Sequence, residues 1–264
     1  MISRLIRFLN KPAAERNRLL LQRIKMLSAL PFYFGKANLP FSFLAYQPDS
    51  HAHFDQHKEY DALFKSFTAH NRFNNAGDGA RLWSLILNIK QVLDENVPGD
   101  FAELGVWRGN TASVLAHYAA QNARTVYLFD TFEGFDTRDL EGVDQNKQMA
   151  FADTSIAMVN EVIGQASACC RFVKGYFPAS LTDEHADKVY AIVSIDCDLY
   201  EPMKAGLAFF YPRMPRGALL LLHDYSSTYW DGAKQAVDEF CRNTGEYAVL
   251  LPDKSGSALI RKSR

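Results

Sequence analysis

The segment FAELGVWRGN, residues 101–110, constrains the fold of this chain more than any other feature. Its pattern predicts a buried strand that runs into a glycine turn and then a helix, with Glu103 just inside the end of the strand. About twenty residues further on, a second apolar run, VYLF, stops at Asp130, which is roughly the spacing that grips a nucleoside ribose. We therefore expect a nucleoside-containing ligand at the carboxyl edge of a parallel sheet.

Apolar periodicity predicts alternating strands and helices from residue 79 onward. The expected strands are 100–104, 125–129, 170–174, 189–195, 217–222, 246–251 and 257–261, and the expected helices are 79–96, 110–121, 154–165, 201–212 and 231–243. Such alternation is typical of an α/β fold with a mostly parallel sheet and helices on both faces. The last two strands, joined by PDKSG, are expected to form a hairpin that puts one antiparallel strand at the sheet edge.

Positive charge is concentrated at the N-terminus. The first 36 residues hold eight Lys or Arg against one acid, Glu15, a balance of +7 that leaves −8 for residues 37–264. The acidic body disfavours nucleic-acid binding. In residues 2–11, apolar side chains recur at helical spacing between basic ones. This segment either packs on its own domain or a partner copy, or lies on an anionic membrane surface.

Nothing in the chain indicates secretion or membrane insertion. The start, MISRLIRFLNK, lacks the apolar stretch and cleavage site of a signal peptide. The apolar run near 218–222 is far too short to span a bilayer. The four cysteines show no CxxC spacing, which favours reduced thiols over a disulfide framework or zinc site. We expect a cytoplasmic protein.

The glycine turn distinguishes between nucleotide-binding classes. Its spacing is GxxxG, which differs from the GxGxxG of dinucleotide folds and disfavours a dehydrogenase. It also lacks the lysine of a P-loop. Glycine lets the backbone approach a ligand closely, and the following helix offers unpaired N–H groups. With Glu103 before the turn and Asp130 after it, we interpret the set as a nucleoside site rather than two ordinary strand-to-helix turns.

Several motifs in order resemble one family, the macrocin O-methyltransferases. The motifs are GDFAELGVWRGNTASVL, VYLFDTFEGF, FADTS, VKGYFPASL, SIDCDLYEPMKAGLAFFYPRMPRGALLLLHDY and AVDEF. Members are class I S-adenosylmethionine-dependent enzymes that methylate sugar hydroxyls on macrolides and related glycosides. The resemblance implies a Rossmann-like, seven-stranded methyltransferase domain at 78–264. Residues 1–77 are then an N-terminal helical and aromatic extension, whose aromatic stretch 31–55 either covers the active site as a lid or packs under a helix.

The resemblance also assigns cofactor-binding residues. It places Glu103, Gly105 and Gly109 around the methionine part of the cofactor and Asp130 on the ribose. The remaining expected contacts come from the glycine turn, from beside the adenosine and from the adenine edge: Val106, Trp107, Asn110, Thr131, Phe132, Asp153, Ser155 and Gly175.

Acidic residues follow two later strands. Asp196 ends one apolar run and the pair His223–Asp224 ends the next, so these residues are expected to face the crevice at the carboxyl edge. The resemblance implies a divalent metal site at Asp196, position 223 and Asp224, suited to Mg²⁺, which would orient the acceptor hydroxyl. It also makes Asp196 a candidate general base. Asp198 is expected to cap the next helix.

The family has an acid where this chain has His223. Imidazole suits Mn²⁺, Fe²⁺ or Zn²⁺ better than Mg²⁺. The site therefore either keeps a metal through Asp196, His223 and Asp224, or loses it and uses His223 as a general base oriented by a carboxylate. In a third alternative, His223 is structural.

The sequence thus predicts an S-adenosylmethionine-dependent O-methyltransferase that acts on a sugar hydroxyl of a glycosylated small molecule or glycan. Tyr225, Tyr229 and Trp230 either form an acceptor wall or pack in the core. The basic N-terminus adds the hypothesis of a lipid-linked acceptor. The alternative functions are methylation of a phenolic or other non-sugar acceptor, and a non-catalytic module that binds S-adenosylmethionine.

Overall fold

The computed structural model describes Arg16 and residues 58–263. The chain divides into two units, residues 1–46 and 47–264, and all the elements below belong to the second. The basic segment 2–11 and the aromatic stretch 31–55 lie outside the described residues, and the predicted boundary at residue 77 stays a prediction.

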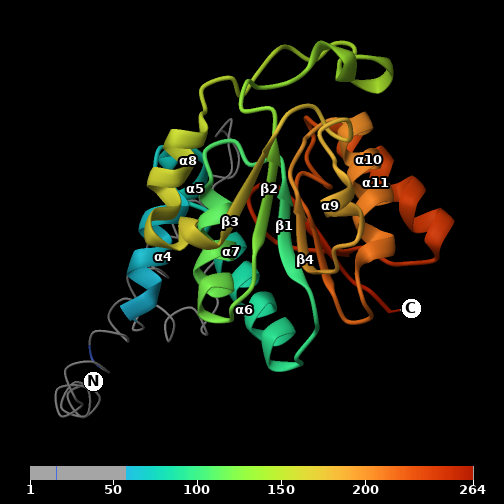
Figure 1. The fold of residues 1–264 in the computed structure, drawn as a ribbon. Helices are drawn as coiled ribbons and strands as arrows, with labels where there is room; N and C mark the ends of the chain where they lie inside the picture. Colours follow the sequence, from blue (N-terminus) through green and yellow to red (C-terminus); the bar gives the residue numbers. More distant parts are fainter. Residues whose placement is uncertain (1–15, 17–57, 264) are drawn as a thin grey trace, which may run out of the picture. The chain divides into compact units, whose positions relative to one another are not determined.

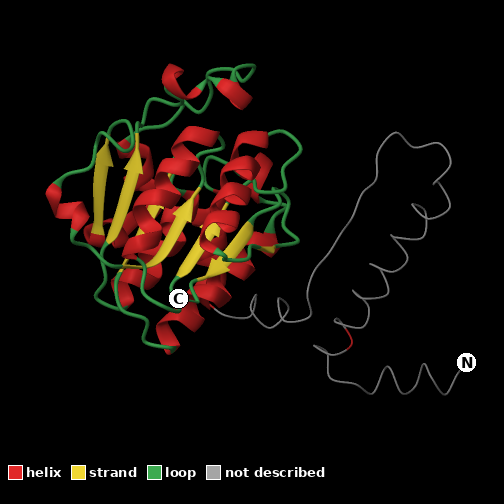
Figure 2. Cartoon of the chain, turned by 90° about the vertical axis from the view of Figure 1, so that its right-hand side faces the viewer, coloured by secondary structure: helices red, strands yellow, loops and turns green. Residues whose placement is uncertain are grey.

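A seven-stranded sheet forms the centre of this domain (Figures 1 and 2). The strand order is β3-β2-β1-β4-β5-β7-β6. Neighbours from β3 to β5 are parallel, and β7 is antiparallel to both β5 and β6. The strands are β1 (Asp100–Leu104), β2 (Val126–Asp130), β3 (Cys170–Lys174), β4 (Tyr190–Ile195), β5 (Leu219–Leu222), β6 (Val249–Leu250) and β7 (Ala258–Arg261). The predicted fold class is confirmed, including the closing hairpin. The outermost strand of that hairpin, β6, is only two residues long.

Helices cover both faces of the sheet (Figure 1). One face carries α6 (Gly79–Asp94), α7 (Asn110–Gln121) and α8 (Ile156–Ile163), and the other carries α9 (Asp183–Ala186), α10 (Tyr200–Phe210) and α11 (Asp231–Thr244). Short 3-10 helices occupy Thr137–Asp139, Gly142–Asp144, Gly164–Cys169 and Tyr211–Arg213. Because both faces are covered, the central strands are predominantly apolar, and every residue of β4 and β5 is buried.

Two helices precede the predicted domain and pack against it. They are α4 (Lys58–Thr68) and α5 (Arg72–Asn75). The Nδ2 group of Asn110, the first residue of α7, donates to the carbonyls of Ser66 and Ala69 at 3.1 and 2.8 Å. The C-terminal end of α4 is therefore fixed to the start of the helix that follows the glycine turn.

A long loop, residues 131–153, lies beyond the tips of the strand arrows, at the top of Figure 2. Its Asp144 is fully buried and accepts a hydrogen bond from the backbone N–H of Tyr200, the first residue of α10, at 2.7 Å. A carboxylate at this position satisfies an N–H group that the helix itself cannot satisfy. The loop is thereby held over the carboxyl edge of the sheet.

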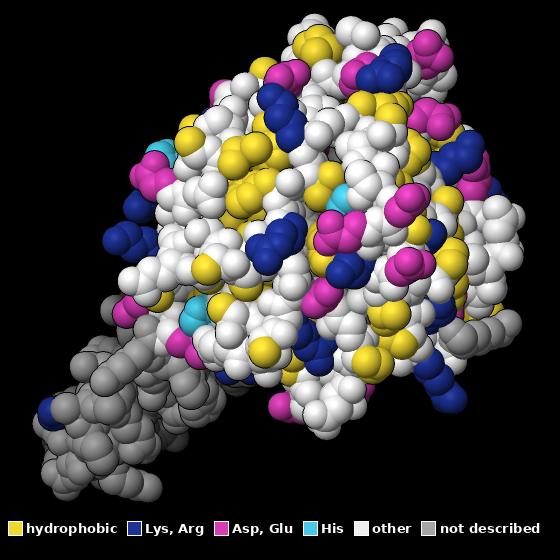
Figure 3. Space-filling view, viewed as in Figure 1, with side chains coloured by type: hydrophobic (Ala, Val, Ile, Leu, Met, Phe, Trp, Pro, Cys, Tyr) yellow, Lys and Arg dark blue, Asp and Glu magenta, His cyan; other side chains and the backbone are white. Residues whose placement is uncertain are grey.

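The visible surface of the described domain mixes basic and acidic side chains (Figure 3). Within the described residues, no helix is long and apolar enough to cross a membrane. All four cysteines are free, with Cys170 and Cys197 buried and Cys169 and Cys241 half-buried.

Candidate active site

A cavity of about 290 Å³ opens at the carboxyl edge, where the strand order reverses between β1 and β4. Ligands of open α/β sheets bind at such switch points because the loops on either side diverge there. Residues at the tips of four neighbouring strands line this cavity: Glu103, Gly105, Asp130, Asp196, His223 and Asp224.

The glycine turn after β1 touches the tip of β4. Gly105 has a φ of +85°, and a Cβ atom there would lie 2.1 Å from the backbone oxygen of Asp196. Only glycine combines this left-handed backbone with so close an approach. The turn that was predicted from spacing is therefore also the contact that brings the two halves of the site together.

Asp130 is held by the backbone of the same turn. Its Oδ2 atom accepts from the N–H groups of Val106 and Trp107 at 2.7 and 2.9 Å, and its Oδ1 atom accepts from the N–H of Phe132 at 2.6 Å. A carboxylate offers about four acceptor positions, so these bonds leave little capacity for further donors. The side chain fixes the turn as well as facing the cavity.

Glu103 is buried in the wall of the cavity and is 1 % exposed. Its Oε2 atom has no hydrogen-bond partner among the described residues. Burial raises the pKa of this carboxyl well above its usual range, and the nearby Asp196 and Asp130 raise it further. Burial therefore favours the neutral form of Glu103, and its unpartnered Oε2 atom is available to a ligand.

The other residues predicted to bind the cofactor divide into two groups. Those that line the cavity are Val106, Trp107, Asn110, Thr131 and Gly175. Those that are absent from its described wall are Gly109, Phe132, Asp153 and Ser155.

The residues of the second group contact neighbouring parts of the protein instead. Gly109 precedes α7, and Ser155 caps α8 by accepting from the N–H of Met158 at 3.2 Å. Asp153 accepts from the indole N–H of Trp107 at 2.9 Å and pairs with Arg108. Phe132 packs against Phe172.

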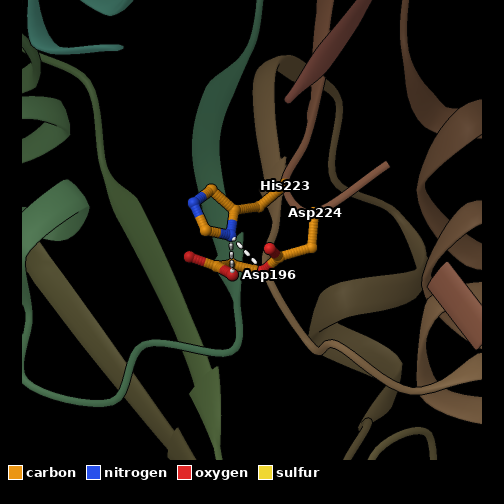
Figure 4. A group of neighbouring side chains, drawn as sticks. All are labelled: Asp196, His223 and Asp224. Atoms are coloured by element: carbon orange, nitrogen blue, oxygen red, sulfur yellow. Dashed lines mark hydrogen bonds and ion pairs between the residues drawn. The ribbon is translucent and has the colours of Figure 1, made fainter. Parts of the chain in front are cut away.

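Three side chains meet at the tips of β4 and β5 (Figure 4). The Nδ1 atom of His223 lies 2.7 Å from Oδ1 of Asp196 and 2.6 Å from Oδ2 of Asp224. All three side chains are largely buried, with exposed fractions of 16 % for His223, 24 % for Asp196 and 10 % for Asp224. The structure thus brings together the three residues that the sequence placed at neighbouring strand ends.

Arg81 of α6 contacts the opposite side of the imidazole. Its Nη1 atom lies 2.5 Å from Nε2 of His223. Its Nη2 atom donates to Oδ1 of Asn75 at 2.6 Å, and its Nε atom lies 3.4 Å from Oδ2 of Asp78. Because a guanidinium has only donors, Nε2 of His223 must accept. The single hydrogen of the neutral ring is then on Nδ1, between the two carboxylates.

The charges around His223 act in opposite directions. Burial lowers its pKa, but Asp196 and Asp224 outweigh burial and raise the pKa to about 10, against a lowering effect of Arg81. The carboxylates thus favour the charged ring, whereas the Arg81 contact requires Nε2 without a proton. The geometry decides for the neutral ring, since two donors cannot face each other at hydrogen-bond distance.

Asp198 is a further member of this acidic group. Burial raises its pKa well above the usual range, with Asp196 and Asp224 adding to the effect, and it is hydrogen-bonded to Asp224. The expectation that Asp198 caps the next helix is wrong. Its backbone is left-handed, with a φ of +62°, and the first N–H of α10 is bound by Asp144 instead.

The predicted metal ligands are in one place, since one ligand atom each from Asp196, His223 and Asp224 lies within 4.8 Å of the others. As arranged, however, Nδ1 of His223 carries a hydrogen. A nitrogen that donates a hydrogen bond has no lone pair for a metal. In this tautomer the three residues do not fit a divalent ion.

Aromatic rings line the entrance between the long loop and α11. The rings of Phe135, Phe151 and Trp230 contact one another, and Phe151 also contacts Trp107. All four line the cavity. Tyr229 is exposed, and Tyr225 donates to Asp238 of α11 at 2.8 Å. Of the three aromatic residues predicted as an acceptor wall, Trp230 alone is among the lining residues that are described.

The amino-acid sequence matches one protein family over most of its length. The macrocin-O-methyltransferase (TylF) family matches residues 49–250. One similar protein is the 8-demethyl-8-(2,3-dimethoxy-alpha-L-rhamnosyl)-tetracenomycin-C 4'-O-methyltransferase of Streptomyces olivaceus, 29 % identical over 186 residues, which are 65 % of this chain and 68 % of that one. Another is the mycinamicin III 3''-O-methyltransferase of Micromonospora griseorubida, 29 % identical over 175 residues, 61 % of this chain and 67 % of that one.

Solved structures agree in fold. The O-methyltransferase NovP superposes with a TM-score of 0.59 at 23 % identity, over 70 % of this chain and 80 % of that one. The calicheamicin methyltransferase CalS11 superposes with a TM-score of 0.56 at 21 % identity, over 85 % of this chain and 99 % of that one.

Proposed function

Because the chain belongs to the macrocin O-methyltransferase family of S-adenosylmethionine-dependent enzymes, we propose that it methylates a hydroxyl of a sugar carried by a small molecule or a glycan. The observation that carries this proposal is the pairing of two different surfaces in one cavity. A buried carboxyl group and a backbone-bound carboxylate lie at the tips of β1 and β2, and a cluster of aspartates with one imidazole lies at the tips of β4 and β5.

The first surface suits the donor. The unpartnered oxygen of Glu103 would accept from the amino group of the methionine part, and Asp130 would accept from the ribose with its remaining capacity. Gly105 and the start of α7 leave room and N–H groups beside them. When bound, S-adenosylmethionine supplies an electrophilic methyl group on a sulfonium cation.

Asp196 would remove the proton. One of its oxygens accepts from His223, which leaves the other for the acceptor hydroxyl. In the transfer, the acceptor oxygen would take the methyl group from the sulfonium, which would leave as a neutral thioether, and Asp196 would take the hydroxyl proton. His223 orients this carboxylate and Asp224 orients His223, while Nε2 of His223 is occupied by Arg81.

The aromatic entrance would hold the acceptor. Trp107 and Trp230 present apolar rings to the cavity, a type of surface that binds the apolar face of a sugar. Relatives of the chain are named for methyl transfer to a rhamnosyl-tetracenomycin and to mycinamicin III, which supports a glycoside as the acceptor.

Labelled-methyl transfer to three acceptors tests this function: an O-rhamnoside, its aglycone and a catechol. We expect label in the rhamnoside, located on a sugar hydroxyl by fragmentation. Label in the catechol or aglycone would instead support the phenolic alternative. Donor binding without transfer to any of the three would support a binding module.

We further propose that the basic segment 2–11 brings the protein to an anionic membrane surface in the cytoplasm, where a lipid-linked acceptor would lie, and that the chain assembles with copies of itself. Vesicle sedimentation of the full chain and of a variant without residues 1–11 tests the first point. Light scattering tests the second, and a single-copy mass would contradict it.

A further inference from the structure

Arg81 is the residue of this site that no motif indicated. It lies in the first turn of α6, its side chain is 13 % exposed, and it lines the cavity beside His223. Its guanidinium is held on three sides, by Asn75, by Asp78 and by the ring of Phe67 at 4.9 Å. A long charged side chain restrained in this way is pre-positioned for the group that it faces.

The group that it faces has two neutral forms. A neutral imidazole carries its hydrogen on either Nδ1 or Nε2, and the partner of one nitrogen selects the state of the other. Arg81 can only donate, so its contact with Nε2 selects hydrogen on Nδ1. The contacts of Nδ1 with Asp196 and Asp224 agree, because ionised carboxylates only accept.

We propose that Arg81 is a positioning residue that holds His223 in the Nδ1–H form, so that Asp196, His223 and Asp224 work as a hydrogen-bonded cluster and not as ligands of a divalent ion. Binding of a metal at Nδ1 would require the hydrogen to move to Nε2, where it would face the Arg81 donors. The positive charge that two adjacent carboxylates need is supplied by the guanidinium itself.

Ring nitrogen spectroscopy tests the tautomer directly. In ¹⁵N-histidine-labelled protein at neutral pH, we expect His223 to show a protonated Nδ1 and an unprotonated Nε2. The variant Arg81→Lys keeps a donor and should keep this signature, whereas Arg81→Met should lose it. Arg216→Met, at an exposed arginine outside the residues that line the cavity, is the matched control. A protonated Nε2 in the wild-type protein would overturn the proposal.

Calorimetry with Mn²⁺ alone, on chelator-treated protein, gives a second readout. Partners of a metal-binding histidine typically change metal affinity by 10–100-fold, and here the partner opposes binding. We expect Mn²⁺ to bind Arg81→Met at least about tenfold more tightly than the wild type or Arg216→Met. Equal affinity in Arg81→Met and the wild type would contradict the proposal, as would tight binding to the wild type. Should Arg81→Met fail to fold, wild-type affinity and the Arg81→Lys spectrum still decide the question.

The catalytic readout rests on the proposed function. Methyl transfer by the wild type should be unchanged by excess chelator, and Arg81→Met should lower kcat by roughly tenfold or more with little change in the KM for the donor. A wild type that transfers no methyl group to any acceptor would refute the proposed function, but the spectroscopic and Mn²⁺ results would still test Arg81. Methyl transfer that a chelator abolishes would contradict the proposed role of Arg81 but not the proposed methyltransferase function.

Discussion

The two halves of the cavity are built in different ways. At the tips of β1 and β2, the backbone forms most of the surface: a glycine turn, the start of α7, and a carboxylate that accepts from three backbone N–H groups of the adjoining loops. At the tips of β4 and β5, ionisable side chains form the surface and hold one another. A backbone site suits a ligand that is always the same, whereas a side-chain cluster can change its chemistry by one substitution, such as the histidine at position 223.

We expect the largest effect from a substitution that removes the proton acceptor at the tips of β4 and β5. Asp196→Asn keeps the shape of the side chain but cannot take a proton. We expect kcat to fall by about 10²–10⁴-fold, with donor affinity unchanged, in a labelled-methyl assay run beside calorimetry. Retention of more than about a tenth of the wild-type kcat would show that Asp196 is not the base.

A substitution in the glycine turn after β1 should lower both stability and donor binding. Gly105→Ala places a Cβ atom 2.1 Å from the Asp196 carbonyl, and we expect it to lower the free energy of unfolding by roughly 2–5 kcal/mol and to abolish donor binding. Gly142→Ala is the matched control, because Gly142 also has a positive φ but nothing lies within 4 Å of its Cβ position. Its cost should be about 1 kcal/mol. Equal losses in both variants, by chemical denaturation, would mean that the close approach is unimportant.

The long loop offers a smaller test. Asp144→Ala removes the acceptor for the first N–H of α10, and we expect a loss of about 1 kcal/mol in unfolding free energy together with faster proteolysis between residues 131 and 153. Asp144→Asn keeps an acceptor oxygen and should lose less. Resistance to protease equal to that of the wild type in Asp144→Ala would show that other contacts hold the loop.

The smallest effect concerns the pH dependence of stability. Burial raises the pKa of Glu103 above its ordinary value, so the folded state binds this proton more tightly than the unfolded state does. The contribution of Glu103 to stability is therefore full below the unfolded pKa and is lost as pH rises through the folded pKa. Relative to Glu103→Gln, the wild type should lose unfolding free energy as the pH rises above the ordinary pKa of a glutamate. A constant difference would indicate an unshifted carboxyl.

The difference between the two halves of the cavity also explains which parts of the site could be predicted from the sequence. The first half depends on residues close together in the chain, so the spacing of Glu103, Gly105 and Asp130 was sufficient to place it. Asp196 and His223 could be brought together because consecutive parallel strands end at one edge of the sheet. The mostly parallel seven-stranded sheet, the helices on both faces and the family were confirmed.

The errors and omissions involve contacts between distant parts of the chain. Arg81 precedes His223 by 142 residues, and nothing in its local sequence, RLWSLIL, distinguishes it from a solvated arginine at the start of a helix. Asp144 reaches α10 from a loop without periodic pattern. Asp198 stands where a capping residue is common, but its left-handed backbone turns the carboxyl toward Asp224. Local sequence patterns do not predict contacts between residues that are far apart in the chain.

The most direct test of the division between donor surface and acceptor chemistry is a paired calorimetric titration of the wild type and Asp196→Asn with S-adenosylhomocysteine, the demethylated donor. We predict the same affinity in both proteins, although only the wild type transfers methyl groups. Loss of binding in Asp196→Asn, or no binding by the wild type, would contradict the account.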